Sequence, residues 1–227
     1  MDKNLFLEKY KKIKISLEKY IKDIEIIVKK NIGIDNKNRP TFEGNCFYEN
    51  LSFNRSSALL NKQVNLYWSG STINRRVCEI GFNAGHSALL MLLGAENKDI
   101  EFTIFDIGQH DYTALTIDYI KSKFLNVTFE YIEGNSIETI PVWIEKNKNC
   151  LGTYDLIHVD GGHSEECIKN DMMNMDKLIK LGGIIIIDDT NASWINKYVD
   201  VYLQTGKYKE IHILHTPMYP HRMIQRI

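Results

Sequence analysis

Three aspartates stand at the ends of two apolar segments. Residues 154–160 read YDLIHVD and residues 183–189 read GIIIIDD. The first segment therefore ends at Asp160, and the second ends at Asp188 and Asp189. If the segments form neighbouring strands, the three carboxylates converge and push one another toward protonation. Neither turn contains Lys or Arg, and a hard divalent cation resolves such a conflict. We therefore predict a divalent-metal site, with Mg²⁺ as the first choice. The alternative is that one acid caps a helix and another faces water.

A histidine lies three residues beyond Asp160, on the same Gly-Gly turn. This residue, His163, could act as a general base beside the carboxylates, or it could be structural or exposed to solvent. His163 and Asp160 are the candidate catalytic residues. His158 lies inside the apolar segment and is predicted to be a core histidine with its hydrogen bonds satisfied.

A glycine-containing turn, EIGFNAGHSA at 79–88, follows another apolar segment. Glycine at Gly81 and Gly85 permits positive φ and close approach of a ligand to the backbone. The helix that begins near His86 would direct its free N–H groups at an anionic group. The spacing is GxxxG, so the GxGxxG dinucleotide fingerprint is absent. A cofactor site and a plain tight connection both fit this turn.

Two later strand ends carry further polar candidates. Asp106 ends the segment 101–106, where an acid in a nucleotide-binding sheet typically accepts hydrogen bonds from ribose hydroxyls; a surface aspartate is the alternative. Asn135 and Ser136 follow the segment 127–132 and could contact an adenine edge. Ser136 could equally be a turn or cap residue.

Apolar and helical segments alternate from residue 76 onward, and this pattern would position the candidates. The predicted strands are 77–81, 101–106, 127–132, 154–160, 183–188, 209–215 and 222–227, with helices near 86–94, 112–124, 140–147, 164–180 and 192–204. Such alternation predicts an α/β fold with a mostly parallel seven-stranded sheet and helices on both faces. Ligands bind beyond the carboxyl ends of such strands, so the candidates belong to one region.

We divide the chain into an N-terminal helical extension with a lid, 1–75, and a core, 76–227. Apolar residues recur every three or four positions over residues 4–30 and predict an amphipathic helix. Its lysine-rich face is either solvated or turned to a membrane or nucleic acid, and its apolar face could pack on the core or on a homodimer partner. Residues 41–75 fit either a lid over the substrate or a connector.

Composition is typical of a soluble globular domain. The 227 residues have a net charge of −1, with 44% hydrophobic and 25% charged residues. This balance argues against disorder and against strong attraction to nucleic acid or to an anionic membrane. No run approaches the roughly 18 apolar residues of a membrane span, no signal peptide is evident, and the cysteines show no CxxC spacing. We expect a cytoplasmic protein.

In combination, these motifs resemble the class I S-adenosylmethionine-dependent methyltransferases, which have a Rossmann-like fold. More narrowly, they resemble the metal-dependent O-methyltransferases of the catechol and macrocin types. The resemblance rests on EIGFNAGHSA, Asp106, GNS at 134–136, DLIHVDGGHS and GGIIIIDDT, and it covers about residues 60–190. It implies S-adenosylmethionine and a divalent metal as cofactors.

The resemblance also implies a role for each candidate. Cofactor-binding positions would be Gln63, Glu79, Gly81, Phe82, Asn83, Gly85, Ser87, Asp106, Asn135, Ser136 and Asp160. Ser87 would bond the cofactor carboxylate, and Lys62–Gln63 would close over the cofactor. Asp160, Asp188 and Asp189 would be metal ligands, although catechol-type relatives have Asn at the position of Asp189. His163 falls where those relatives carry a catalytic lysine.

The expected reaction is metal-assisted O-methylation of a small-molecule hydroxyl. Metal dependence suits a sugar diol or a catechol, because two adjacent hydroxyls can chelate the ion. Two alternatives stay open. An NAD-linked oxidoreductase would share the alternating sheet, but this chain lacks the third glycine of the dinucleotide fingerprint. A non-catalytic cofactor-binding domain could assemble through the N-terminal helix.

Overall fold

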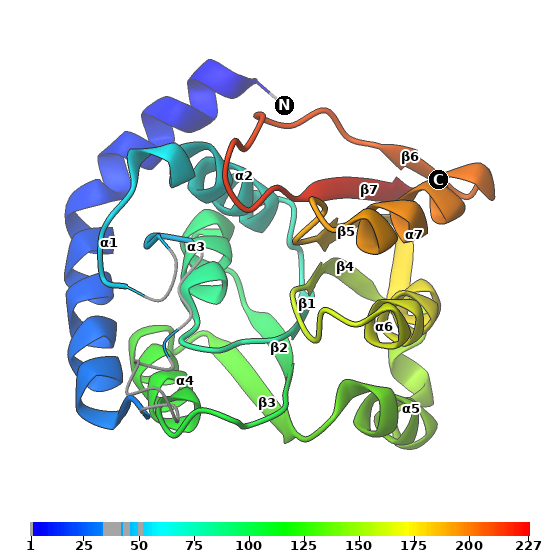
Figure 1. The fold of residues 1–227 in the computed structure, drawn as a ribbon, viewed down its shortest axis with the longest axis horizontal. Coiled ribbons are helices and arrows are strands. Elements are labelled where there is room, and N and C mark those ends of the chain that lie inside the picture. Colours follow the sequence, from blue (N-terminus) through cyan, green and yellow to red (C-terminus); the bar gives the residue numbers. More distant parts are fainter. Residues whose placement is uncertain (1, 34–41, 43–45, 50–51) are drawn as a thin grey trace.

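A seven-stranded sheet forms the centre of the computed structural model, which describes residues 2–33, 42, 46–49 and 52–227. The strand order is β3-β2-β1-β4-β5-β7-β6 (Figure 1). The strands are β1 (Arg76–Ile80), β2 (Ile100–Asp106), β3 (Val127–Glu133), β4 (Tyr154–Val159), β5 (Ile179–Ile187), β6 (Tyr208–Glu210) and β7 (Arg222–Arg226). The first five run parallel, and β7 runs antiparallel to β5 and β6. The predicted α/β, mostly parallel seven-stranded sheet is confirmed.

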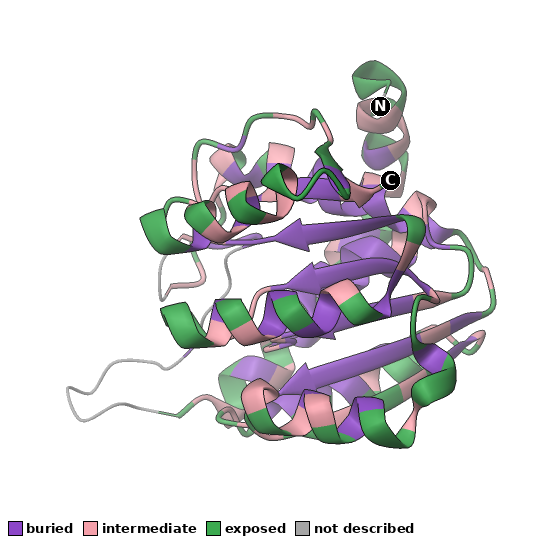
Figure 2. Cartoon of the chain, turned by 90° about the vertical axis from the view of Figure 1, so that its right-hand side faces the viewer, coloured by how far each residue is buried: buried purple, intermediate pink, exposed green. Residues whose placement is uncertain are grey.

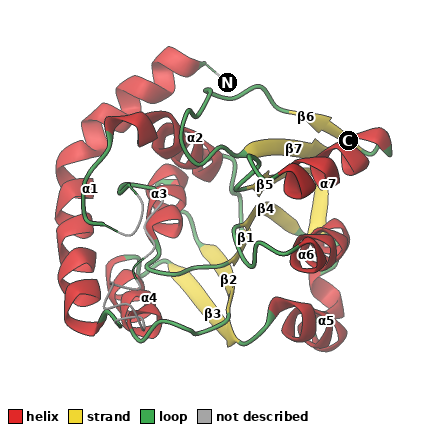
Figure 3. Ribbon diagram, in the orientation of Figure 1, coloured by secondary structure: helices red, strands yellow, loops and turns green. Residues whose placement is uncertain are grey.

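Helices cover both faces of this sheet (Figure 3). They are α1 (Lys3–Asn31), α2 (Leu60–Ser71), α3 (His86–Ala95), α4 (Tyr112–Lys123), α5 (Ser136–Lys146), α6 (Glu165–Leu178) and α7 (Ser193–Gln204), with short 3₁₀ turns at Ser57–Leu59 and Lys148–Cys150. One apolar core lies between the sheet and α1–α4, and the other lies between the sheet and α5–α7. The central strands are buried on both sides, whereas the helices alternate buried and exposed faces (Figure 2).

The N-terminal helix α1 is amphipathic, as its spacing predicts. Leu17, Ile21 and Ile24 are buried against the body, while Ile15 stays exposed. The helix packs along α4 and α2, and the Tyr119 hydroxyl donates a hydrogen bond to an Asp23 carboxylate oxygen at 2.7 Å. No described helix is long and apolar enough to cross a membrane. The homodimer stays a prediction.

Helix α2 is the element that the sequence pattern did not reveal. Part of the predicted lid segment, residues 41, 43–45 and 50–51, lies outside the described residues, but residues 60–71 form a helix that is almost wholly buried. It crosses α3 closely. A Cβ atom at Gly70 would lie 1.9 Å from the Met91 carbonyl oxygen, and one at Gly94 would lie 1.9 Å from the Tyr67 carbonyl oxygen. Only glycine permits this approach.

Two predicted boundaries near the carboxyl ends of the strands need correction. Helix α5 begins at Ser136 rather than near 140, because Asn135 is its N-cap and accepts a hydrogen bond from the Ile137 N–H at 3.1 Å. The predicted strand 209–215 is reduced to Tyr208–Glu210. The chain beyond it is instead tied to α2, where the Asn65 amide donates to the Leu214 carbonyl and accepts from the Leu214 N–H.

Candidate active site

The ends of three adjacent strands bring the site together. Three backbone hydrogen bonds continue the strand pairing past the ends of the strands. The Gly81 N–H donates to the Phe105 carbonyl, the Asp160 N–H donates to the Ile80 carbonyl, and the Asp188 N–H donates to the Val159 carbonyl. These bonds place Gly81, Asp160 and Asp188 side by side. Gly81 has φ +84°, and a Cβ there would lie 1.9 Å from the Asp160 carbonyl oxygen. The strands can therefore meet this closely only with glycine at this position.

A cavity of about 370 Å³ opens beyond these strand ends. Nine of the predicted site residues line it: Gly81, Phe82, Asn83, Ser87, Asp106, Asn135, Ser136, Asp160 and His163. The glycine turn, the end of β2, the start of α5 and the turn after β4 thus share one wall. This arrangement can hold one extended ligand.

The Asp106 carboxylate holds the glycine turn in shape. Its Oδ2 atom accepts the Phe82 and Asn83 N–H groups at 2.8 and 2.9 Å, and its Oδ1 atom accepts the Gly108 N–H at 2.8 Å. Asn83 has φ 53° and accepts a hydrogen bond from the Tyr112 hydroxyl. A carboxylate has about four acceptor positions, so Asp106 retains capacity for one more donor from the cavity.

A buried hydrogen-bond chain lies beneath the turn. The Ser87 hydroxyl donates to Oε1 of Glu79 at 2.5 Å, and Nδ1 of His158 lies 2.7 Å from the same oxygen. Glu79 and His158 are fully buried. The second carboxylate oxygen of Glu79 and Nε2 of His158 have no hydrogen-bond partner among the described residues. His158 is a core histidine as predicted, but only one of its two nitrogens is satisfied.

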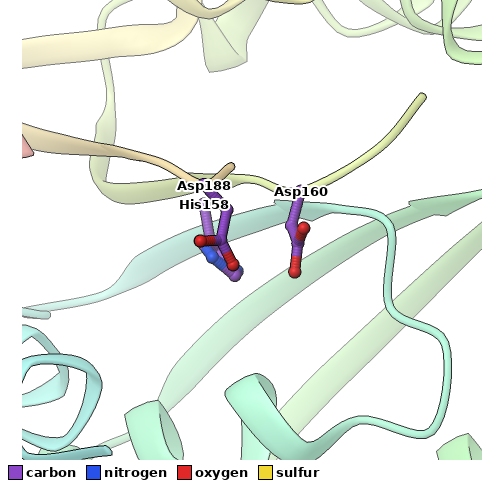
Figure 4. A group of neighbouring side chains, drawn as sticks. All are labelled: His158, Asp160 and Asp188. Carbon is purple, nitrogen blue, oxygen red and sulfur yellow. The ribbon is translucent and has the colours of Figure 1, made fainter. Parts of the chain in front are cut away.

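The three predicted acids converge, in two overlapping groups. His158, Asp160 and Asp188, here called the inner cluster, offer ligand atoms that lie within 4.8 Å of one another (Figure 4). Asp160, His163 and Asp189, here called the outer cluster, do the same. The donor sets of both clusters, carboxylate oxygens with an imidazole nitrogen, fit a divalent cation.

A lysine from a distant part of the chain neutralises the inner cluster, which corrects the expectation from the turns alone. Nζ of Lys62, on α2, lies 2.5 Å from Oδ2 of Asp188, and both side chains are buried. Burial raises the pKa of Asp188, but Lys62, by charge and hydrogen bond, together with His221 and His158 outweighs burial and holds the pKa below its ordinary value. Burial by itself would lower the pKa of Lys62, but the charge of Asp188 and of other nearby groups holds this pKa above its ordinary value. In this structure Lys62 forms a buried ion pair, and its closure over the cofactor stays a prediction.

Burial and neighbouring charges shift the pKa values of two further groups in the acidic region, Asp160 and His221. Burial, and then the charge of Asp188, raise the pKa of Asp160 well above its ordinary value. Burial lowers the pKa of His221, whose Nε2 atom lies 3.0 Å from the Asn65 amide, to about 3. In the outer cluster, Nε2 of His163 lies 2.8 Å from Oδ2 of Asp189.

Comparison with known proteins decides the family. A model described as a methyltransferase domain matches residues 78–190, about half of the chain. The chain belongs to the class I S-adenosylmethionine-dependent methyltransferases. Comparison with curated protein sequences gives no match.

Solved structures share the fold of this methyltransferase at low sequence identity. A candidate O-methyltransferase from Klebsiella pneumoniae is 13% identical with a TM-score of 0.55, and the match covers 78% of this chain and 82% of that one. Cofactor-bound Rv0187 from MTB is 15% identical with a TM-score of 0.56, covering 77% and 82%. The candidate RNA methyltransferase PH1948 from Pyrococcus horikoshii is 8% identical with a TM-score of 0.50, covering 82% and 92%.

The cavity fits the cofactor of a methyltransferase of this class. Its volume is of the size expected for a small-molecule site, and the N-terminal end of α3 faces the glycine turn. Nε2 of His86 is buried beside the cavity without a partner among the described residues, and burial lowers its pKa to about 3. The unpartnered oxygen of Glu79 adds a buried acceptor near the same turn. S-adenosylmethionine carries donors and acceptors that can satisfy such groups.

Three predicted cofactor positions do not line the cavity. Glu79 is fully buried beneath it, and its Oε1 accepts a hydrogen bond from Ser87, which does line the cavity. Gln63 donates to the Cys46 carbonyl at 2.8 Å and accepts from the Tyr10 hydroxyl, so it supports a wall segment instead of closing over the cofactor. Gly85 has φ +74°, and a Cβ atom at this position would meet the side chains of Phe82 and Ile120.

Sequence reasoning also missed part of the cavity wall. Cys46, Phe105, Ile107, Gln109, His110 and Cys167 contribute to it. Gln109 and His110 lie three and four residues beyond Asp106, so the rule that the residues after a strand line the ligand site could have found them. Cys46 had no such signal, because it is brought in by tertiary packing of a segment far from the strands.

Proposed function

We propose that this methyltransferase transfers the methyl group of S-adenosylmethionine to a hydroxyl of a small molecule, with the assistance of a divalent cation. The observation that carries the proposal is the convergence of Asp160, Asp188 and Asp189 beside the cofactor cavity. The acceptor that we propose is a sugar or a catechol-like diol. Two adjacent hydroxyl oxygens can chelate a cation held by the carboxylates, which fixes the acceptor in one orientation.

The cofactor and the cation would each supply one part of the chemistry. S-adenosylmethionine supplies an electrophilic methyl group on a sulfonium. A divalent cation lowers the pKa of a coordinated hydroxyl and orients it. The role of the protein is to hold the two groups at one place, and Asp160 is suited to this because it belongs to the cavity wall and to both acidic clusters.

His163 is the candidate for accepting the proton of the acceptor hydroxyl. Its side chain is 60% exposed and lines the cavity, and Nε2 pairs with Asp189. Its backbone carbonyl accepts a hydrogen bond from the Trp194 indole N–H at 2.9 Å, which anchors the turn. Asp189 would stabilise the imidazolium that forms. General-base catalysis of this kind typically contributes about 10²–10⁴ in rate.

A small-molecule acceptor is favoured over nucleic acid by charge. The net charge of the chain is −1, and the cavity wall contributes the carboxylates of Asp106 and Asp160. Carboxylates beside the acceptor site would repel a phosphate backbone, whose recognition depends on Lys and Arg. The NAD-linked alternative is not favoured, since the turn has GxxxG spacing.

The test is a methyl-transfer assay with labelled S-adenosylmethionine against catechol and a panel of sugar diols, with Mg²⁺ or Mn²⁺ and with a chelator. Asp160→Ala should abolish transfer yet leave the affinity for S-adenosylhomocysteine within about tenfold, because its main role is at the cation. Glu165→Gln, an exposed carboxylate on α6, is the matched control and should retain activity. Undiminished turnover in Asp160→Ala would remove the metal mechanism, and cofactor binding without transfer to any hydroxyl would favour the non-catalytic alternative.

A further inference from the structure

The Lys62 ammonium is held rigidly at the inner cluster. Lys62 comes from the buried helix α2, and its side chain is fully buried. Nζ lies 2.5 Å from Oδ2 of Asp188 on one side and 5.8 Å from the centre of the Tyr219 ring on another. An ammonium placed between a carboxylate and an aromatic face has little freedom to leave.

Both oxygens of Asp188 are engaged. Oδ2 accepts from Lys62, and Oδ1 accepts from the Asp189 N–H at 3.0 Å. A divalent ion bound to Asp188 would have to lie next to the ammonium. Like charges at such a separation repel strongly in a buried site, where there is little solvent to screen them. This repulsion, and not a lack of acceptor positions, disfavours a second cation at Asp188.

The inner cluster nevertheless has the donor set of a cation site. A nitrogen of His158 lies within 4.8 Å of carboxylate oxygens of Asp160 and Asp188. His158 is fully buried, its Nδ1 is used by Glu79, and its Nε2 has no hydrogen-bond partner among the described residues. Figure 4 shows the three side chains facing one space. Lys62 brings its positive charge to this cluster at Asp188.

The outer cluster differs in its access and in its backbone. Asp160 and His163 line the cavity, and the Asp189 side chain is 15% exposed. Asp189 has φ 53°, a conformation that non-glycine residues rarely adopt, and its carboxylate contacts Nε2 of His163 at 2.8 Å. Such strained positions cluster at functional sites. An ion that enters through the cavity therefore meets the outer cluster first, at Asp160 and His163, with Asp189 directly behind His163.

We propose that Lys62 is the resident cation of the inner cluster and confines a divalent ion to the side of Asp160 and Asp189. This inference rests on the proposed function and changes its ligand set: Asp188 does not ligate the ion. Lys62 is accordingly a positioning residue, because it places the ion toward the cavity and the acceptor without touching either.

The test measures binding of Mn²⁺ alone by calorimetry in the full chain. The informative variant is the double substitution Lys62→Met with Asp188→Asn, which removes both charges of the pair and leaves the net charge of the site unchanged. Replacing a buried ion pair by neutral side chains is often neutral for stability, so this variant should fold. Asp189→Asn removes a proposed ligand and serves as the comparison in which binding should weaken. Lys62→Met alone removes the ammonium and leaves the Asp188 carboxylate able to bind the ion.

The double variant should bind Mn²⁺ within about threefold of wild type, Asp189→Asn should weaken binding at least about tenfold, and Lys62→Met should tighten it at least about tenfold. A tenfold loss in the double variant would overturn the inference, because Asp188 would then be a ligand. So would unchanged affinity in Asp189→Asn. Absence of Mn²⁺ binding in both wild type and Lys62→Met would overturn it together with the metal part of the proposed function. Binding in Lys62→Met alone would also overturn it, because Lys62 would then exclude the ion from the site instead of confining it to one side. If Lys62→Met does not fold, the other two variants decide.

Discussion

Nδ1 of His158 lies 2.7 Å from Oε1 of Glu79, and neither side chain is exposed to solvent. The pair joins β4 to β1 directly beneath the site, and the same oxygen of Glu79 accepts the Ser87 hydroxyl at the start of α3. One carboxylate oxygen therefore holds together two strands and the helix that faces the cofactor cavity.

Glu79→Gln should weaken both folding and cofactor binding. The substitution keeps the shape but removes the charge that both donors use, and a hydrogen bond to a charged group contributes about 1.5–3 kcal/mol. We expect a loss of about 2 kcal/mol in the free energy of unfolding in urea, with weaker binding of S-adenosylhomocysteine by calorimetry. Glu138→Gln, on the exposed face of α5, is the control. An unchanged unfolding midpoint in Glu79→Gln would show that the buried chain does not stabilise the fold.

Asp155 should account for part of the loss of stability in acid. It accepts the backbone N–H groups of Asn74, Arg75 and Arg76 at 3.0, 2.6 and 2.8 Å and pairs with Lys180. Burial raises its pKa, but Lys180 and these N–H groups outweigh burial and hold the pKa of Asp155 below 3.8. Because the folded pKa is the lower one, the contribution is complete above the unfolded value and is lost as pH falls through the folded value.

Asp155→Asn should therefore be less stable than wild type at neutral pH, by about 1–3 kcal/mol. The difference between the two proteins should shrink as pH falls from about 5 to about 2. Urea unfolding at a series of pH values measures this. A difference that stays constant across the series would show that Asp155 does not titrate with a lowered pKa.

Gly94→Ala should destabilise the protein although alanine favours helices. The gain in helix propensity is about 1 kcal/mol, whereas the new Cβ would lie 1.9 Å from the Tyr67 carbonyl oxygen. A clash with backbone forces the two helices apart, at a cost of about 1–3 kcal/mol or more. We expect a net loss in the free energy of unfolding. Ser122→Ala, on the exposed face of α4, should change it by less than about 0.5 kcal/mol. A stabilised Gly94→Ala variant would contradict the close crossing of α2 and α3.

Asp106→Asn should weaken cofactor binding through the shape of the glycine turn. An amide nitrogen cannot accept hydrogen bonds, so at least one of the N–H groups of Phe82, Asn83 and Gly108 loses its acceptor. Such a loss corresponds to about 10–100-fold in affinity, measured as the dissociation constant of S-adenosylhomocysteine. Asp111→Asn is the matched control, because the Asp111 side chain makes no cap hydrogen bond to α4. Equal affinities in the two variants would mean that the turn keeps its shape without Asp106.

The order and type of the elements from β1 onward could be predicted because each strand is a short apolar run between turn signals. Asp160 and the pair Asp188 and Asp189 could be placed at one edge for the same reason, since parallel strands end on the same side of a sheet. Helix α2 could not be predicted this way. Its buried face carries Lys62, Gln63 and Asn65, whose partners lie far away in the sequence, so no apolar periodicity marks it.

That missing helix explains the main error about the site. The turns after β4 and β5 contain no cation, and sequence alone assigned the whole compensating charge to a metal. The compensating lysine comes from 126 residues away and is placed by packing of α2 on α3. Local sequence carries no information about such a pairing.

The central claim is that a divalent cation is held beside the methyl group of the cofactor. Its most direct test is the relaxation of the S-methyl protons of S-adenosylmethionine bound to the protein, measured by NMR with Mn²⁺ as a paramagnetic probe. Wild type should show strong broadening that is lost when Asp160→Ala and Asp189→Ala are combined. Equal broadening in both proteins, or none in wild type with Mn²⁺ and cofactor present at saturating concentrations, would contradict the claim.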